Sequence, residues 1–120
     1  MAMTAILYDT MDALGNAELA GVVGTDGLSV EIVLSANSPY EDVEMLEMEV
    51  AGLASMVNAT TTRLGTGPTL DLLIESDYLI YLLSLVTPGY YAVLAIPPDG
   101  NIAHARSTIR HMVTRFQQEL

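Results

Sequence analysis

The most constraining feature of this sequence is a long helical segment that is too apolar for a single neighbour. The segment is expected to run from about Pro39 to Leu64. At about 100° per residue, one apolar stripe comprises Val43, Leu46, Val50, Leu53, Ala54 and Val57. A second stripe, roughly 140° away, comprises Met45, Met48, Gly52, Met56 and Ala59. The remaining narrow face comprises Glu44, Glu47, Ala51, Ser55 and Asn58. A surface helix needs an apolar arc of only about 100°, so the pattern predicts one stripe against the chain's own core and one against a second chain.

Length, charge and cysteine content limit the class of protein. The 120 residues fit one domain, spanning residues 1–120. Because the chain has no cysteine, disulfides, thiolate catalysis and cysteine-based zinc sites are excluded. The net charge of −11 and the lack of lysine argue against nucleic acid and anionic membranes as partners. Three of the four arginines, Arg106, Arg110 and Arg115, lie in the last twenty residues.

One uncharged stretch, Tyr78 to Pro98, is long enough to span a bilayer as a helix. Thr87, Pro88 and Gly89 lie in its middle, where proline and glycine break helices and favour turns. The pattern therefore predicts a buried β-hairpin and no membrane insertion. The first residues lack the basic region of a secretory signal, which favours a cytoplasmic protein.

The remaining patterns predict an α/β (α+β) sandwich. A first helix ends near Gly15, and strands are expected over residues 18–24, 28–34, 69–75, 78–86 and 90–96. Ser38 and Glu41 form a capping box for the long helix, and a last helix begins near Ile102. Strands 78–86 and 90–96 are apolar on both faces, so both faces of the sheet must be covered. We therefore expect the order α-β-β-α-β-β-β-α, with a five-stranded antiparallel sheet, the long helix on one face and the N- and C-terminal helices on the other, a profilin-like arrangement.

No catalytic, cofactor-binding or metal-binding residues are predicted, and we expect a non-enzymatic protein. His104 and His111 share a helix face but lie about 10 Å apart along its axis, too far to chelate one metal. Glu44 and Glu47 form a carboxylate pair on an open polar face, which lacks the two different environments that acid–base catalysis requires. The methionines of the second stripe fit either an adaptable binding surface or ordinary core filling.

Several segments resemble the roadblock family, which includes roadblock-type dynein light chains, late-endosomal adaptor subunits and MglB-like regulators of Ras-like small GTPases. The matching segments are GVVGTDGL at 21–28, EVAGLA at 49–54, LDLLIE at 70–75, YAVLAI at 91–96 and the helix start NIA at 101–103. The resemblance covers residues 3–120. It departs at Ala103, where many members have glycine, and in the complete lack of lysine.

The resemblance implies a homodimer, or a dimer with a paralogue, formed by pairing the long helices and joining the third strands edge to edge. The implied interface residues are Met45, Met48, Gly52, Met56, Ala59, Leu70, Leu72 and Leu73. The partner-binding residues are expected to be Glu44, Glu47, Ser55 and Asn58. Asp71 and Glu75 would discourage indiscriminate edge pairing.

The resemblance also implies a function: a dimeric scaffold or regulator that binds a Ras-like small GTPase and modulates its nucleotide cycle or localisation. Two alternatives remain open at this point. One is a structural adaptor subunit of a larger complex, and the other is a small-molecule sensory domain.

Overall fold

The computed structural model describes residues 2–26, 29–35 and 42–119, without the side chains of Ala2, Ser29 and Val30. The elements in chain order are α1 (Ala2–Leu14), β1 (Leu19–Gly24), β2 (Ser29–Leu34), α2 (Val43–Arg63), β3 (Asp71–Glu75), β4 (Ile80–Thr87), β5 (Tyr90–Ile96) and α3 (Ile102–Glu119). This order and element type confirm the predicted α+β architecture.

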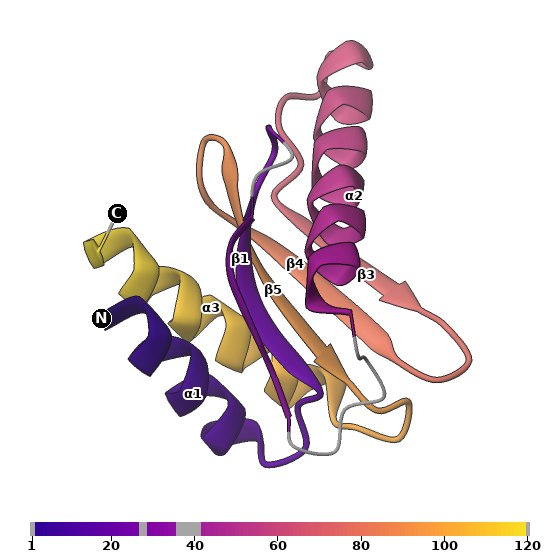
Figure 1. Ribbon diagram of the computed structural model, residues 1–120. Helices are drawn as coiled ribbons and strands as arrows, with labels where there is room; N and C mark the ends of the chain where they lie inside the picture. Colours follow the sequence, from indigo (N-terminus) through magenta and orange to yellow (C-terminus); the bar gives the residue numbers. More distant parts are fainter. Residues whose placement is uncertain (1, 27–28, 36–41, 120) are drawn as a thin grey trace.

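The five strands form one antiparallel sheet in the order β2-β1-β5-β4-β3, with β2 and β3 at its edges. In Figure 1, α2 lies on one face of the sheet, while α1 and α3 lie side by side on the other. The hairpin predicted between Tyr78 and Pro98 is confirmed as β4 and β5. No helix in the described part of the chain is long and apolar enough to cross a membrane.

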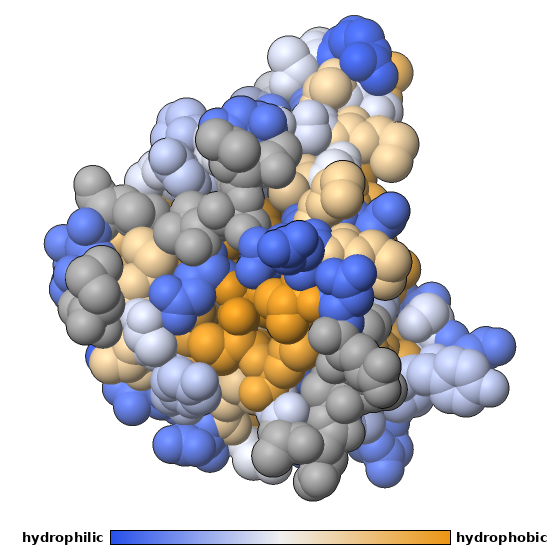
Figure 2. Space-filling view, in the orientation of Figure 1, coloured by the Kyte–Doolittle hydropathy of each residue, from blue (hydrophilic) through white to orange (hydrophobic). Residues whose placement is uncertain are grey.

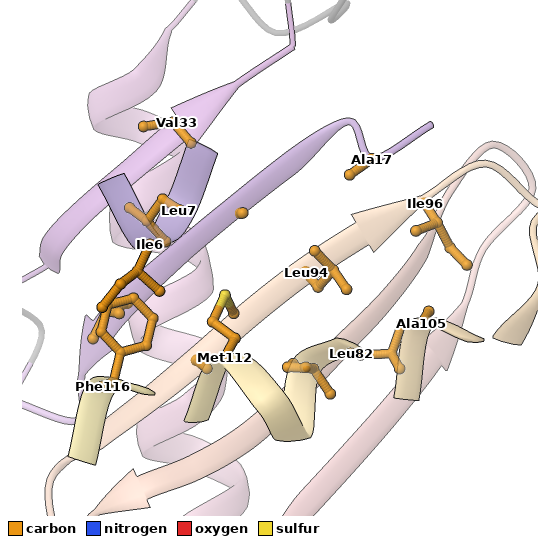
Figure 3. Close-up of a cluster of buried hydrophobic side chains, with 14 of the residues drawn as sticks. Ile6, Leu7, Ala17, Val33, Leu82, Leu94, Ile96, Ala105, Met112 and Phe116 are labelled. Atoms are coloured by element: carbon orange, nitrogen blue, oxygen red, sulfur yellow. The ribbon is translucent and has the colours of Figure 1, made fainter. Parts of the chain in front are cut away.

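The sheet separates two apolar cores. Figure 3 shows the core under α1 and α3, where Phe116 and Met112 of α3 lie close to Ile6 of α1. The core under α2 contains Leu46 and Val50 of the helix. They pack against the strand residues whose side chains point to the α2 side of the sheet. Alternation along β4 confirms the prediction that both faces are covered, since Leu82 joins the first core and Leu83 the second.

The long helix starts later than predicted. Asp42 has an extended backbone (φ −102°, ψ 93°), and its carboxylate accepts a hydrogen bond of 3.0 Å from the Met45 N–H, as an N-cap does. A helix starting at about Pro39 is therefore wrong, since Val43 is the first helical residue. The predicted capping box of Ser38 and Glu41 lies outside the described residues.

The far end of the helix agrees with the prediction. Gly65 has a φ of 78°, in the left-handed region that favours glycine, and its N–H donates to the Thr62 carbonyl at 3.0 Å.

The sheet-facing side of α2 is rotated from the predicted stripe. Its buried residues are Leu46, Val50, Ala51 and Ala54. Ala51, predicted to lie on the polar face, is 0% exposed, so that assignment is wrong. By helical geometry the buried arc is centred about 40° from the predicted stripe. Val43, Leu53 and Val57 of that stripe are only half-buried as a result.

Candidate partner-binding surface

The outer side of α2 carries the second apolar stripe, and it is open in the single chain. Met45, Met48 and Met56 are 51%, 65% and 61% exposed. Gly52 lies among them, and a Cβ atom placed there would meet nothing within 4 Å. Exposed methionines on adjacent helical turns form a flexible apolar surface that a monomer rarely leaves open.

A groove of about 650 Å³ runs beside this stripe. It exists because α2 packs over β1 and β2, which leaves the β4–β3 half of that sheet face beside the helix rather than under it. The helix wall comprises Met45, Leu46, Met48, Glu49, Val50, Gly52, Leu53 and Met56. The sheet wall comprises Ile74 of β3 and Tyr81 of β4. Figure 2 shows weakly apolar side chains along α2.

The sheet wall differs in detail from the residues expected from the sequence. Leu72 pairs with Leu83, so it lies on the α2 face, and Leu70 is 64% exposed just before the strand. Leu73 pairs with Leu82 and packs in the core under α1 and α3, so its side chain points away from the groove. Ile74 was missed, although strand alternation from Leu72 places it on the groove face.

The open edge of β3 adjoins the groove. The Leu85 N–H donates to the Leu70 carbonyl, which shows that even-numbered residues here direct their backbone toward β4. Alternation then turns the N–H and C=O groups of Asp71, Leu73 and Glu75 outward, away from the sheet. The groove therefore lies next to a row of backbone groups that can pair with another strand.

A hydrogen-bond network fixes the two walls relative to each other. The Thr69 N–H donates to Asn58 Oδ1 at 3.2 Å, and Thr69 Oγ1 donates to the Val57 carbonyl at 3.0 Å. The hydroxyl of buried Tyr91, on β5, donates to the Thr69 carbonyl and lies 3.3 Å from Asn58 Oδ1. This network ties the start of β3 to α2 and to the centre of the sheet. The strand β3 was predicted to begin at Thr69 and begins at Asp71 instead.

The four expected partner-binding residues lie in different environments. Glu44 is exposed, while Glu47, Ser55 and Asn58 are half-buried. The carboxamide oxygen of Asn58 is engaged by Thr69 within the chain. Glu44 therefore offers the most accessible side chain of the four.

Burial raises the pKa of the Tyr91 hydroxyl above its ordinary value near 10. The folded state therefore holds this proton more tightly than the unfolded state. We expect stability to be insensitive to this group below pH 10 and to fall as the pH rises above 10, where only the unfolded chain readily loses the proton. Denaturant titrations at a series of alkaline pH values would measure this slope.

Tyr91→Phe is the matched variant, because it keeps the ring and removes the hydroxyl. It should lower the free energy of unfolding by about 1–2 kcal/mol at neutral pH, since the Thr69 carbonyl loses its donor. The variant should also show a smaller loss of stability above pH 10 than the wild type. Identical alkaline slopes in the two proteins would show that Tyr91 is not the titrating group.

The opposite side of the molecule carries a polar groove between α1 and α3. His104 and His111 are exposed there, beside Arg115, whose guanidinium lies 3.0 Å from the Asp9 carboxylate. Over the ranges 2–26, 29–35 and 42–119, no group of three or more metal-ligating side chains comes together.

Comparison with known proteins supports the architecture. No model of a protein family matches the sequence, and a comparison with curated protein sequences finds no match. An MglB structure with a tetrameric arrangement is similar with a TM-score of 0.84 and 14% identity, covering 98% of this chain and 86% of that chain. MglC from Myxococcus xanthus has a TM-score of 0.72 and 27% identity, covering 100% of both chains.

A Roadblock/LC7 domain from Streptomyces avermitilis has a TM-score of 0.81 and 14% identity, covering 96% of this chain and 94% of that chain. The more distant profilin II of Acanthamoeba castellanii has a TM-score of 0.51 at 15% identity, with 98% and 94% covered. The protein is thus a profilin-like α+β sandwich. More specifically, it has the fold of the roadblock family.

Proposed function

We propose that this protein is a non-enzymatic, dimeric scaffold that binds a Ras-like small GTPase and modulates its nucleotide cycle or localisation. The main observation that supports a dimer is the exposed apolar stripe of α2, which lies next to the open edge of β3. The similarity to MglB, MglC and Roadblock/LC7 structures and the resemblance of the sequence to MglB-like regulators support the GTPase as partner.

The proposed dimer uses both features together. Two copies related by a twofold axis would pair their α2 helices through Met48, Gly52 and Met56, while their β3 strands join into a continuous sheet. Gly52 allows close approach of the helix backbones because it has no side chain and no neighbour within the chain. A second chain would cover the apolar groove and satisfy the outward backbone groups of β3.

The GTPase would contact the paired α2 helices on the side of Glu44, Glu47 and Ser55. The test is binding of the purified dimer to each Ras-like GTPase of the source organism, loaded with GDP or with a non-hydrolysable GTP analogue. We expect one GTPase to bind with a preference for one nucleotide state, and its rate of nucleotide exchange or hydrolysis to change.

Glu44→Arg is the matched variant for this contact, because the side chain is exposed and the change reverses its charge. It should weaken GTPase binding while leaving the dimer intact. If the dimer binds none of the candidate GTPases in either nucleotide state, a GTPase is not its partner. That result would favour the role of a structural adaptor subunit.

A further inference from the structure

The β3 edge carries two carboxylates on one face of the sheet. Asp71 pairs with Ser84 and Glu75 pairs with Ile80, whose side chain lies in the core under α1 and α3. Because directly opposed residues share a face, both carboxylates point to the α3 side. Both residues are exposed at the edge.

Self-pairing of this strand brings the two carboxylates together. A twofold axis at Leu73 is the arrangement that pairs all five residues of β3, and it also pairs the outward backbone groups of Asp71, Leu73 and Glu75. In that register Asp71 of each copy lies directly opposite Glu75 of the other. Like charges in directly opposed positions destabilise a strand pair, so the joined edge needs a counter-charge.

Arg110 on α3 is placed to supply the counter-charge. Its Nη2 lies 3.6 Å from Asp71 Oδ2, and its side chain is 67% exposed. The other carboxylate oxygen of Asp71 accepts a hydrogen bond from the Ser84 hydroxyl, which holds the carboxylate on the α3 side. A guanidinium has five N–H donors, and this one contact leaves donors available.

Glu75 is the complementary group. Within the part of the chain that the structure describes, neither of the two ion pairs includes Glu75. The strand register places Glu75 of a second copy beside Asp71, and therefore beside Arg110. Arg106 lines the same shallow cavity as Arg110, next to Leu73 and Asp71, and adds a second positive charge on this side of the edge.

From this placement we infer that Arg110 forms an ion pair across the dimer with Glu75 of the second copy, so that its guanidinium lies between Asp71 and the opposing Glu75 and offsets their repulsion, twice in each dimer. The inference rests on the proposed dimer and identifies the side chain that lets an acidic edge pair with itself. It makes Arg110 a specificity-determining residue of the interface.

The test compares dimer dissociation constants by analytical ultracentrifugation at low salt. Arg110→Ala should raise the dissociation constant at least about tenfold. Each dimer loses two ion pairs, and its two opposed pairs of carboxylates, Asp71 and Glu75 of the other copy, are left without a counter-charge. The matched control is Arg115→Ala, which removes the same charge from the same helix and breaks a similar ion pair with Asp9. It should change the constant by less than about twofold, since the pair is far from β3.

Glu75→Gln completes a double-mutant cycle with Arg110→Ala. In the Arg110→Ala background it should restore most of the lost affinity, because the neutral amide removes the repulsion with Asp71 of the other copy. Raising the salt concentration should shrink the effect of Arg110→Ala. Far-ultraviolet circular dichroism should show wild-type helix content for every variant, because Arg110 and Glu75 are exposed.

The outcomes separate the two proposals. A wild-type protein that stays monomeric at high concentration overturns the dimer, and the ion pair with it. A wild-type dimer in which Arg110→Ala and Arg115→Ala behave alike overturns the ion pair alone. The same holds if Glu75→Gln weakens the dimer further in the Arg110→Ala background.

Discussion

Replacing Met56 with aspartate should convert the proposed dimer into a folded monomer. The side chain is 61% exposed in the single chain, so the change should alter protomer stability by no more than about 0.5 kcal/mol. In the proposed dimer the new carboxylate would be buried without a partner, twice, and we expect the dissociation constant to rise at least about a hundredfold. Light scattering over a concentration series, combined with thermal unfolding, measures both effects.

The matched control is Tyr8→Asp. Tyr8 is 53% exposed on α1, on the opposite face of the sheet. This variant therefore replaces a large exposed side chain with the same charged one, away from the groove. It should remain as dimeric as the wild type. An unchanged dissociation constant for Met56→Asp, or equal losses for both variants, would place the interface elsewhere.

Replacing Gly21 with alanine should destabilise the protomer by about 1–3 kcal/mol. Gly21 lies in β1, and an added Cβ atom would come within 2.6 Å of Ile32 Cγ1 and 2.8 Å of the Glu31 carbonyl oxygen. The second contact is with backbone, which cannot rotate away, so β1 and β2 must separate locally. Urea denaturation in the Met56→Asp background isolates this effect from the proposed dimerisation, which would otherwise add to the apparent stability.

Gly52→Ala in the same background is the control. The new methyl group meets nothing within 4 Å, and alanine is preferred to glycine inside a helix. This variant should therefore gain about 0.5–1 kcal/mol. If Gly21→Ala were as stable as the parent, β1 and β2 would not approach each other as closely at Gly21 as described.

Most of the fold was predictable because periodicity and turn residues are local properties of the sequence. Alternation along β4 predicts which side chains enter each core, and Leu82 and Leu83 confirm it. Pro88 and Gly89 predict the turn that makes a hairpin out of a stretch long enough to span a membrane. Ile109 and Phe116, seven residues apart in α3, share one face of the helix, and both are buried.

The start of α2 was not predictable from local rules, because two residues compete for the same role. Ser38 is followed by proline and then by Glu41, a sequence typical of a helix start. Asp42 is an equally good N-cap residue, and its carboxylate is the one that binds the Met45 N–H. The rule identifies suitable residues and does not choose between them.

The groove and the network behind it depend on contacts that are distant in the sequence. Ile74 and Tyr81 line the groove because α2 packs over β1 and β2, and neither the strand order nor the helix position follows from periodicity. The polar side of α2 predicts an accessible Asn58. Its partner Tyr91 lies 33 residues away, and this long-range contact withdraws the side chain into the structure.

The hydrogen bonds that join Thr69 to both α2 and β5 have a consequence for the rate of association. Since the helix and the strand edge are held in one arrangement within the single chain, little ordering entropy would be lost when the proposed dimer forms. Assembly should resemble the docking of two rigid bodies, with an encounter rate set by orientation and charge. Loss of the Tyr91 hydroxyl should loosen these hydrogen bonds and slow formation of the proposed dimer, although the Tyr91 side chain is buried within its own chain.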